Sequence, residues 1–260
     1  MLLQCAVRLA LMEELSALTF VLLVTGGFAA GFINTVASGG SAISVPILIE
    51  LLGSATIANG TNRVAILFQN LVGVSRFQKG GKVPWKRVLP LLPAAVVGGY
   101  AGSKIATSIP PEVMRRVFGV VIVLVALSVV MKPTAWQGSG TQRLKEPWLS
   151  IVFFGIGLYG GLVQAGVGFL LLAGLVLGLG LDLVSGNAAK LVVVLGVTVV
   201  ALPVFVAAGQ VRWMVGLILA VGNMTGAYVA AHLAIKKGAT WLRWVLVGAA
   251  LTAAARMLFF

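Results

Sequence analysis

The sequence predicts an all-α polytopic membrane protein built from two inverted-topology repeats, with broken or re-entrant helices and about eight to ten membrane segments. Hydrophobic residues make up 60% of the chain and charged residues 10%, whereas soluble globular domains carry about 45–50% and about 25%. The apolar residues recur in stretches close to the roughly 20 residues that cross a bilayer. An internal repeat relates the two halves. These observations leave little chain for a soluble domain.

The basic net charge of +13 does not indicate nucleic acid here. Most Lys and Arg residues lie in short loops between apolar runs, which is the arrangement that sets membrane topology. The expected partner is therefore the lipid bilayer, and no nucleic acid is expected. The single cysteine, Cys5, excludes an intramolecular disulfide and a cysteine metal cluster. The sequence contains no nucleophile elbow, paired-histidine metal site or phosphate-binding loop, so we expect no enzyme activity, metal or cofactor.

Ten apolar runs follow one another along the chain. They are 16–37, 41–52, 61–78, 88–107, 113–131, 149–165, 167–181, 187–208, 212–235 and 241–260. The second run of each half is too short for a comfortable span, so the first two runs of each half form either a re-entrant hairpin or a broken helix. We divide the chain into an N-terminal tail (1–15), a first transmembrane repeat (16–131), a polar cytoplasmic linker (132–148) and a second transmembrane repeat (149–260).

The two halves match at four landmarks in the same order. The landmarks of the first half are Gly31 through Gly40, Asn59 through Arg63, Gly81 through Trp85, and Gly98 with Gly102. Their counterparts are Gly157 through Gly166, Gly186 through Lys190, Gly209 through Trp213, and Gly222 with Gly226. The residue numbers of matching positions differ by nearly the same amount throughout, which indicates a duplication.

An odd number of runs in each half makes the second half inverted relative to the first. Basic residues crowd the loop at 76–87, whereas the matching loop carries only Arg212. Under alternating topology, loop 76–87, the linker and the loop around Lys236 share one side, which the positive-inside rule makes the cytoplasm. Both termini would then face outward. Three basic residues, Lys104, Arg115 and Arg116, run against this orientation.

These motifs together resemble the sulfite exporter TauE/SafE family, also called the toluene-sulfonate uptake permeases. The resemblance rests on the Gly-rich openings, Gly60-Thr61-Asn62, the Gly-x-Val-x-Trp turns at 81–85 and 209–213, and Leu179-Gly180-Leu181-Asp182. It covers about residues 20–260. It implies secondary transport of small sulfur oxyanions or organosulfonates (sulfite, sulfoacetate or arylsulfonate type) across a prokaryotic inner (plasma) membrane. The individual substrate and the direction stay open.

Polar residues accompany the glycines at the opening of each half. A helix that breaks inside a bilayer leaves backbone groups unpaired, which is tolerated where the break lines a cavity. Half-helix N-termini there can bind an anion. The alternative is close helix packing through small residues. The candidate substrate-binding residues at these openings are Asn34, Ser38, Gly39, Gly40, Ser41, Gln164, Gly166 and Gly168.

Two basic residues, Arg63 and Lys190, occupy the same repeat position at the start of the third run of each half. A charge within hydrocarbon usually faces a cavity or a partner, and a substrate anion can be that partner. The alternatives are snorkelling to a headgroup or an ion pair with Glu50 or Asp182. The remaining candidate substrate-binding residues are Thr61, Asn62, Gln69, Asn70 and Asn187.

We therefore expect a secondary transporter of small anions that works by alternating access. Its substrate would sit near the bilayer midplane between the two breaks, with Arg63 as its principal charge partner, because the planar guanidinium can bind two sulfonate oxygens at once. A proton or a sodium ion is the candidate coupling ion, and the protein is a monomer or a homodimer. The alternatives are an uncoupled anion channel and a non-transporting membrane scaffold.

Overall fold

A computed structural model of the protein describes residues 17–120 and 144–259, and side chains as far as residue 242. The helices, in chain order, are α2 (Ala17–Ala37), α3 (Ser41–Leu52), α4 (Ala55–Lys79), α5 (Trp85–Val88), η1 (Leu89–Leu91), α6 (Leu92–Ser108), α8 (Trp148–Leu162), α9 (Val167–Ala173), η2 (Gly174–Gly178), α10 (Leu183–Ala207) and α11 (Trp213–Phe259). Residues 111–120 are also helical, and no strand occurs within the described ranges. The all-α prediction is confirmed. The predicted tail, the end of the fifth run and most of the linker lie outside the described residues.

The helix boundaries differ from the predicted runs at one functionally important place in each half. Helices α4 and α10 begin at Ala55 and Leu183, several residues before the predicted starts at 61 and 187. The Ser54 side chain caps α4 by accepting a hydrogen bond from the Ile57 N–H at 3.5 Å, and Asp182 caps α10. Such side chains satisfy N–H groups that have no partner inside the helix. Arg63 and Lys190 therefore lie about two turns inside their helices.

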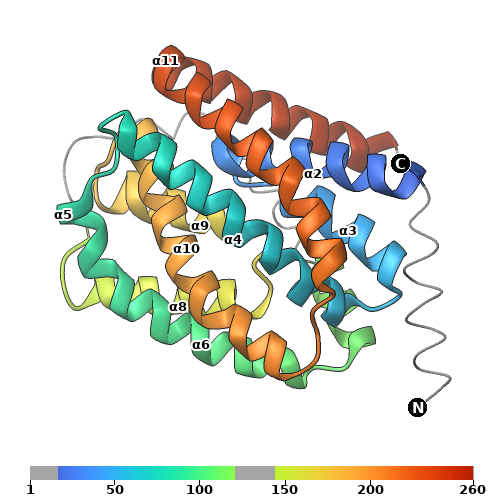
Figure 1. The fold of residues 1–260 in the computed structure, drawn as a ribbon. Helices are drawn as coiled ribbons and strands as arrows, with labels where there is room; N and C mark the ends of the chain where they lie inside the picture. The colour runs from blue at the N-terminus through green and yellow to red at the C-terminus, as the bar shows by residue number, and fades with distance from the viewer. Residues whose placement is uncertain (1–16, 121–143, 260) are drawn as a thin grey trace, which may run out of the picture.

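The last two predicted runs form two helical segments of α11 that meet at a sharp bend. Gly238 has φ 73° and ψ −166°, a conformation outside the helical region, and it separates two helical segments of α11. A left-handed φ of this kind favours glycine, because a Cβ there meets the backbone. The chain reverses at this bend, so the C-terminal segment of α11 runs back across the molecule (Figure 1). The bend lies close to the predicted boundary between the runs at 212–235 and 241–260.

The first helix of each half packs against the fourth helix of the other half. Helix α2 lies on α11, α8 lies on α6, and α4 and α10 pack together in the middle (Figure 1). Glycines permit both crossings: a Cβ at Gly31 would stand 2.2 Å from the Asn223 carbonyl oxygen, and one at Gly157 would stand 2.1 Å from that of Ala95. This reciprocal packing is what two related halves would produce. The division into two inverted repeats remains a prediction.

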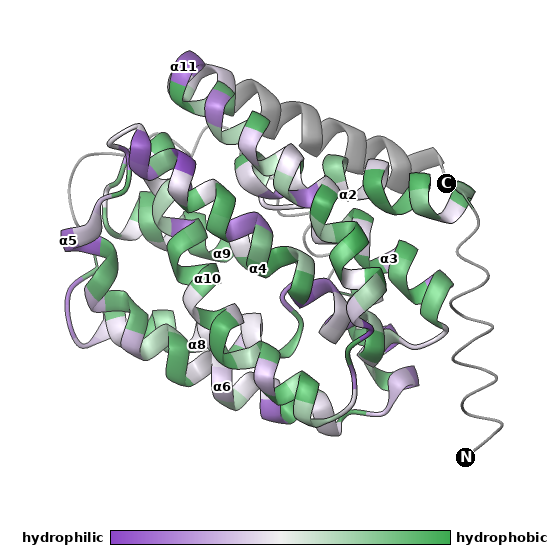
Figure 2. Cartoon of the chain, in the orientation of Figure 1, coloured by the Kyte–Doolittle hydropathy of each residue, from purple (hydrophilic) through white to green (hydrophobic). Residues whose placement is uncertain are grey.

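Four described helices are long and apolar enough to cross a membrane: Ala17–Ala37, Trp85–Ser108, Leu183–Ala207 and Trp213–Leu242. Three further apolar helices are shorter, at Ser41–Leu52, Trp148–Leu162 and Val167–Gly178. Helix α4 has the same 25-residue length as α10, but polar side chains interrupt it. Figure 2 shows those hydrophilic positions on α4 among mainly hydrophobic helices. The protein is thus a multi-pass membrane protein with its most polar long helix shielded inside.

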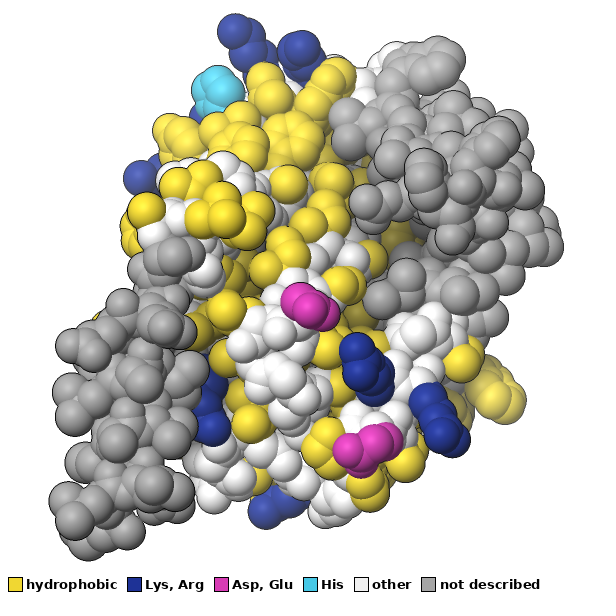
Figure 3. All heavy atoms as spheres, turned by 90° about the vertical axis from the view of Figure 1, so that its right-hand side faces the viewer, with side chains coloured by type: hydrophobic (Ala, Val, Ile, Leu, Met, Phe, Trp, Pro, Cys, Tyr) yellow, Lys and Arg dark blue, Asp and Glu magenta, His cyan; other side chains and the backbone are white. Residues whose placement is uncertain are grey.

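One end of the helix bundle gathers the segments that were predicted to be cytoplasmic. Arg76 Nη2 lies 2.6 Å from His232 Nδ1, Arg87 donates to the Leu179 carbonyl at 3.3 Å, and the Leu144 N–H donates to the Gly178 carbonyl at 3.0 Å. The opposite end faces the viewer in Figure 3, where acidic and basic side chains are mixed. The basic loops therefore share one side of the molecule. Which side faces the cytoplasm remains a prediction.

Candidate functional site

Both halves break their first helical hairpin at a residue that is not glycine. Ser38 follows α2 with φ 68°, and Gln164 follows α8 with φ 63°. Left-handed backbone is uncommon outside glycine and indicates a conformation that the surrounding structure imposes. The chain then re-enters a helix at Ser41 in the first half and, after Gly166 with φ 76°, at Val167 in the second. The predicted breaks are present at the predicted residues. In each half the second helix folds back along the first, as in the hairpin alternative: a Cβ on Gly26 would lie 2.7 Å from Ile47 Cδ1, and one on Gly174 would lie 3.5 Å from the Phe153 ring.

The two breaks meet each other inside the protein. A Cβ built on Gly168 would lie 2.6 Å from the Ser38 Cβ, and one on Gly39 would lie 3.7 Å from the Phe169 ring. Gly40 packs in the same close way, since its Cβ would stand 1.9 Å from the Ala30 carbonyl oxygen. Protein atoms therefore fill the space beside Gly40 and Gly168. In this conformation, close packing explains these two glycines, which were also predicted to let an oxyanion approach.

The Lys190 ammonium lies at the first break, surrounded by four oxygen atoms. Its Nζ donates to the carbonyl oxygens of Asn34 at 2.9 Å and Thr35 at 3.1 Å. It also donates to Ser38 Oγ at 2.9 Å and to Asn187 Oδ1 at 2.7 Å. An ammonium group has three hydrogens, so four acceptors satisfy it completely. Four predicted site residues, Asn34, Ser38, Asn187 and Lys190, are brought together here.

The Arg63 guanidinium lies at the second break and is only partly satisfied. Its Nη2 donates to the carbonyl oxygens of Gly161 at 2.5 Å and Gly160 at 3.2 Å. The Phe205 ring lies 4.5 Å from Arg63 Cζ, within the range of a cation–π interaction. The Nε and Nη1 atoms are buried and have no hydrogen-bond partner among the described residues. Arg63 therefore keeps hydrogen-bond donors without a partner, whereas every hydrogen of the Lys190 ammonium has an acceptor.

Each cation comes from one half and binds the helix end of the other half. Arg63 on α4 meets the last carbonyls of α8, and Lys190 on α10 meets those of α2. Carbonyls at a helix C-terminus lack partners within the helix and carry partial negative charge, so they attract cations. Neither cation pairs with an acid among the described residues. The alternative of ion pairs with Glu50 or Asp182 is not seen, and full burial (0% and 1% exposed) excludes snorkelling in this conformation.

An amide network links the first break to the middle of α4. Gln69 Oε1 accepts hydrogen bonds from Asn34 Nδ2 at 3.2 Å and from Asn223 Nδ2 at 3.3 Å. Both amide atoms of Asn70 are buried without a partner in the described structure. Asn70 follows Arg63 by seven residues, about two helical turns, so the two side chains share one face of α4. The unpartnered donors of Arg63 and Asn70 therefore lie along one line.

Other predicted residues serve the local structure. Asn62 Oδ1 accepts from Ser44 Oγ at 2.8 Å, and Thr61 Oγ1 accepts from the Arg212 N–H at 3.0 Å. Gln164 Nε2 donates to Thr198 Oγ1 at 3.2 Å, while its Oε1 is unpartnered. The remaining predicted residues in these segments are Ser41, the first residue of α3, and Gly166, which precedes α9. Thr61 and Asn62 are thus separate from both cation clusters.

Sequence reasoning missed three side chains that contact this site. Asn59 Nδ2 donates to the Leu162 carbonyl at the second break at 2.8 Å, Phe205 covers Arg63, and Thr198 binds Gln164. Asn59 was detectable, because it precedes Arg63 by four residues and so shares its helix face. Phe205 and Thr198 sit in a long apolar run, and no pattern in the sequence distinguishes them.

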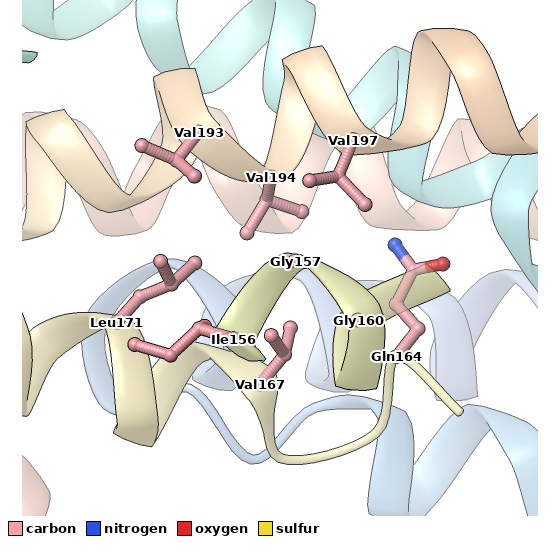
Figure 4. A pocket seen from close by; sticks show the side chains of 9 residues that line it. All are labelled: Ile156, Gly157, Gly160, Gln164, Val167, Leu171, Val193, Val194 and Val197. Carbon is pink, nitrogen blue, oxygen red and sulfur yellow. The ribbon is translucent and has the colours of Figure 1, made fainter. Parts of the chain in front are cut away.

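A small pocket lies beside the second break, between α8, α9 and α10 (Figure 4). Its lining is formed by Ile156, Gly157, Gly160, Gln164, Val167, Leu171, Val193, Val194 and Val197. Gln164 is the polar side chain in this lining, and the space is barely enough for one water molecule. A sulfonate does not fit there without movement of the surrounding helices. Within the described residues, no group of acids, histidines or cysteines could hold a metal ion.

Comparisons with known proteins agree with this architecture. A family model described as sulfite exporter TauE/SafE matches residues 23–257. A Sinorhizobium sp protein named probable membrane transporter protein ORF9 is 28% identical over 249 residues, 95% of each chain. A Haemophilus influenzae protein named probable membrane transporter protein is 25% identical over 239 residues, covering 90% of this chain and 92% of that one.

The Escherichia coli K12 protein named probable membrane transporter protein YfcA is 22% identical over 231 residues, covering 88% of this chain and 86% of its own. No solved structure matches the chain. The family model spans nearly all the described helices, including both breaks and both buried cations. The chain therefore belongs to the sulfite exporter TauE/SafE family, as the order of its Gly-rich openings and turns predicted.

Proposed function

We propose that the chain is a secondary transporter that moves small anions, sulfur oxyanions or organosulfonates, by alternating access. Its family and the names of its relatives indicate a membrane transporter rather than an enzyme. The observation that carries the anion proposal is Arg63, which is fully buried, has no acidic partner among the described residues and keeps two nitrogens without a hydrogen bond. We infer that the anion is its counter-ion.

The physical argument starts from the cost of burying a charge. An ionised side chain inside a membrane protein usually faces a partner or a substrate pathway. The two carbonyls that Arg63 contacts offset part of this cost, but they do not neutralise the charge. An anion with several acceptor oxygens would neutralise Arg63 and use its unpartnered nitrogens in charge-assisted hydrogen bonds. Asn70, on the same face of α4, offers a further unpartnered amide along the path.

The closed state of the site supports the proposal of alternating access. Both buried cations are shielded from solvent, and the pocket at the second break is too small for a sulfonate. Repeat-built transporters open such a site by moving one group of helices against the other. The two breaks contact each other at Ser38 and Gly168. The two halves therefore touch next to the buried cations. A rigid scaffold needs no such buried charge, and an uncoupled channel would keep a continuous pore.

The proposal is tested by binding and transport with purified protein in liposomes. Arg63→Ala should weaken binding of sulfite or a sulfonate about ten- to a hundred-fold, because a hydrogen bond to a charged group contributes about 1.5–3 kcal/mol. Arg63→Lys should recover only part of this affinity, since it keeps the charge without the planar donors. The matched control is Lys104→Ala, which removes an exposed cation that lies 5.7 Å from the Tyr100 ring.

Two outcomes would contradict the proposal. If folded Arg63→Ala binds the anion as well as the parent while Lys104→Ala does not, the wrong cation has been chosen. If no anion raises the melting temperature of the parent protein while cations do, the substrate class is wrong, since a ligand that binds the folded form must raise it. Uphill accumulation of the anion in liposomes separates a coupled transporter from a channel.

A further inference from the structure

The four oxygen atoms around Lys190 have the composition of a site for a small monovalent cation. We propose that these atoms form such a site, that the tethered ammonium of Lys190 occupies it in place of sodium, and that the coupling ion is a proton carried by this amine. The coupling part of this inference rests on the proposed transport function. The cation site itself does not, and it can be tested without any substrate.

The ligand set is made only of oxygen. Two backbone carbonyls, from Asn34 and Thr35, belong to the C-terminal end of α2, where the helix dipole is negative. The Ser38 hydroxyl and the Asn187 amide oxygen complete the set from the break and from α10. Carbonyls at the ends of broken helices are the usual ligands for coupling ions in transporters built from repeats. Nζ lies 2.7–3.1 Å from all four atoms.

The equivalent position in the other half shows that this set is not a general consequence of the fold. Arg63 meets two carbonyls of α8 and no side-chain oxygen. In the sequence alignment of the halves, Asn187 corresponds to Gly60, and Ser38 corresponds to Gln164, which is bonded to Thr198 instead. The first break has therefore acquired side-chain oxygens that suit a cation. It also leaves Lys190 without a free donor for an anion.

The surroundings of Lys190 contain no described acid that could neutralise it. Helix α10 packs against α2, α4, α5, α6, α8, α9, α11 and η2. Helices α2 and α9 and the turn η2 have no ionisable side chain, and α8 has only Tyr159, which donates to the Ala165 carbonyl. The described ionisable groups on the other four elements are Arg63, Arg76, Lys79, Lys86, Arg87, Tyr100, Lys104, Tyr228, His232, Lys236 and Lys237.

None of those groups forms a hydrogen bond with Lys190. The ammonium charge is therefore balanced by dipoles alone. Loss of a proton from Nζ to water leaves a neutral amine, with no change in any other bond, and removes one positive charge from the interior. The neutral amine has two hydrogens for four acceptors, so it binds the end of α2 less strongly. Proton release would then loosen the contact between α2 and α10, which is how the amine would couple to movement.

The cation site is tested by replacing Lys190, which removes the ammonium group that occupies it. Folded Lys190→Ala should gain saturable stabilisation by sodium, seen as a rise in melting temperature on the order of a few °C in sodium chloride over choline chloride at equal ionic strength. The parent protein should show no such difference. Two controls should also show none: Arg63→Ala, which empties a position with only two carbonyls, and Lys190→Ala combined with Asn187→Leu, which removes a ligand. A folded Lys190→Ala that melts equally in both salts overturns the proposal.

Transport by the parent protein gives a second measurement, which does not depend on the folding of any variant. The probe is a sulfonate that stays fully ionised, so any proton moved is carried by the protein. A pH gradient should drive its accumulation, and a sodium gradient should not. Accumulation driven by sodium alone would overturn the coupling assignment but leave the anion proposal intact. A parent protein that moves no anion under either gradient would contradict the proposed function, while the melting experiment would still judge the cation site.

Discussion

The two helix breaks share one backbone plan but differ in how completely the neighbouring cation is satisfied. At the first break, Lys190 has four oxygen acceptors for three hydrogens. At the second break, Arg63 has two carbonyl acceptors and leaves Nε and Nη1 unpartnered. Positions that correspond in the predicted repeat thus hold one cation whose hydrogens all have acceptors and one that keeps two nitrogens without a hydrogen bond.

This difference teaches that the helix crossings place the two charges, while nearby side chains decide how many acceptors each one has. Both cations reach the carbonyl end of a helix from the other half, so their position follows from how the helices cross. Side-chain oxygens from Ser38 and Asn187 then complete the set at the first break. Gly60, which corresponds to Asn187, has no side chain, so the hydrogen bonds of Arg63 stay incomplete. These contacts are why we propose a cation site at the first break and an anion site at the second.

The largest expected effect is that substitutions of the two cations rank in opposite order for stability and for anion affinity. Lys190→Met in sodium-free buffer should lower the free energy of unfolding by about 3–5 kcal/mol, because it leaves four acceptor oxygens without their donor and each buried unsatisfied group costs about 1–3 kcal/mol. Arg63→Met should cost less, about 1–3 kcal/mol, because it leaves fewer acceptors unsatisfied and also removes two unpartnered donors. Unfolding in detergent micelles, followed by circular dichroism, measures both.

Anion affinity should follow the opposite order in the same proteins. Arg63→Met should lose most of the affinity, while folded Lys190→Met keeps it within a few-fold, because Lys190 has no donor free for an anion. If both variants lose stability and affinity together, the two breaks act as one structural unit and the contrast between them does not hold.

The helix caps provide a smaller and independent comparison. Asp182 Oδ1 accepts from the N–H groups of Val184 at 2.9 Å and Ser185 at 3.0 Å, whereas the bond to Ser54 is long, at 3.5 Å. Asp182→Ala at the start of α10 should therefore cost about 0.5–2 kcal/mol and more than Ser54→Ala at the start of α4. Equal losses, measured as the free energy of unfolding, would show that cap geometry does not decide the difference.

The Asp182 cap should also depend on pH. Burial would raise the pKa of the Asp182 carboxyl, but hydrogen bonds from Ser185 and Val184 and the charge of Lys82 hold the pKa below its ordinary value. Its contribution is therefore fully present above the unfolded pKa of about 3.9 and is lost as the pH falls through the folded pKa. The melting temperature of the parent should fall more steeply below about pH 4 than that of Asp182→Asn.

The smallest effect is expected at Asn70, which would extend the anion path from Arg63. Asn70→Leu should weaken anion binding by about 0.5–1.5 kcal/mol, the contribution of one neutral hydrogen bond, if the amide contacts the anion during transport. Stability should be unchanged or higher, because the substitution removes two buried polar atoms that have no partner in the described structure. Unchanged anion affinity with higher stability would restrict the anion site to Arg63.

The sequence alone determined the features that depend on local composition and spacing. Apolar runs of helical length predicted the helices, and paired Gly and polar residues predicted the breaks at Ser38 and Gln164, because a backbone that stops being helical needs such residues wherever it occurs. The matching order of motifs also placed Arg63 and Lys190 at equivalent positions. None of these inferences required knowledge of which helices touch.

Only the tertiary structure decided what the two cations contact. Hydrogen bonds from Arg63 to Gly160 and Gly161, and from Lys190 to Asn34 and Thr35, join residues far apart in the chain. Such contacts depend on helix crossings made possible by glycine backbones, and no local pattern specifies them. The early starts of α4 and α10 follow from caps that apolar periodicity does not register. The satisfied lysine and the unsatisfied arginine differ because packing brings the side-chain oxygens of Ser38 and Asn187 to Lys190, whereas only two carbonyls reach Arg63.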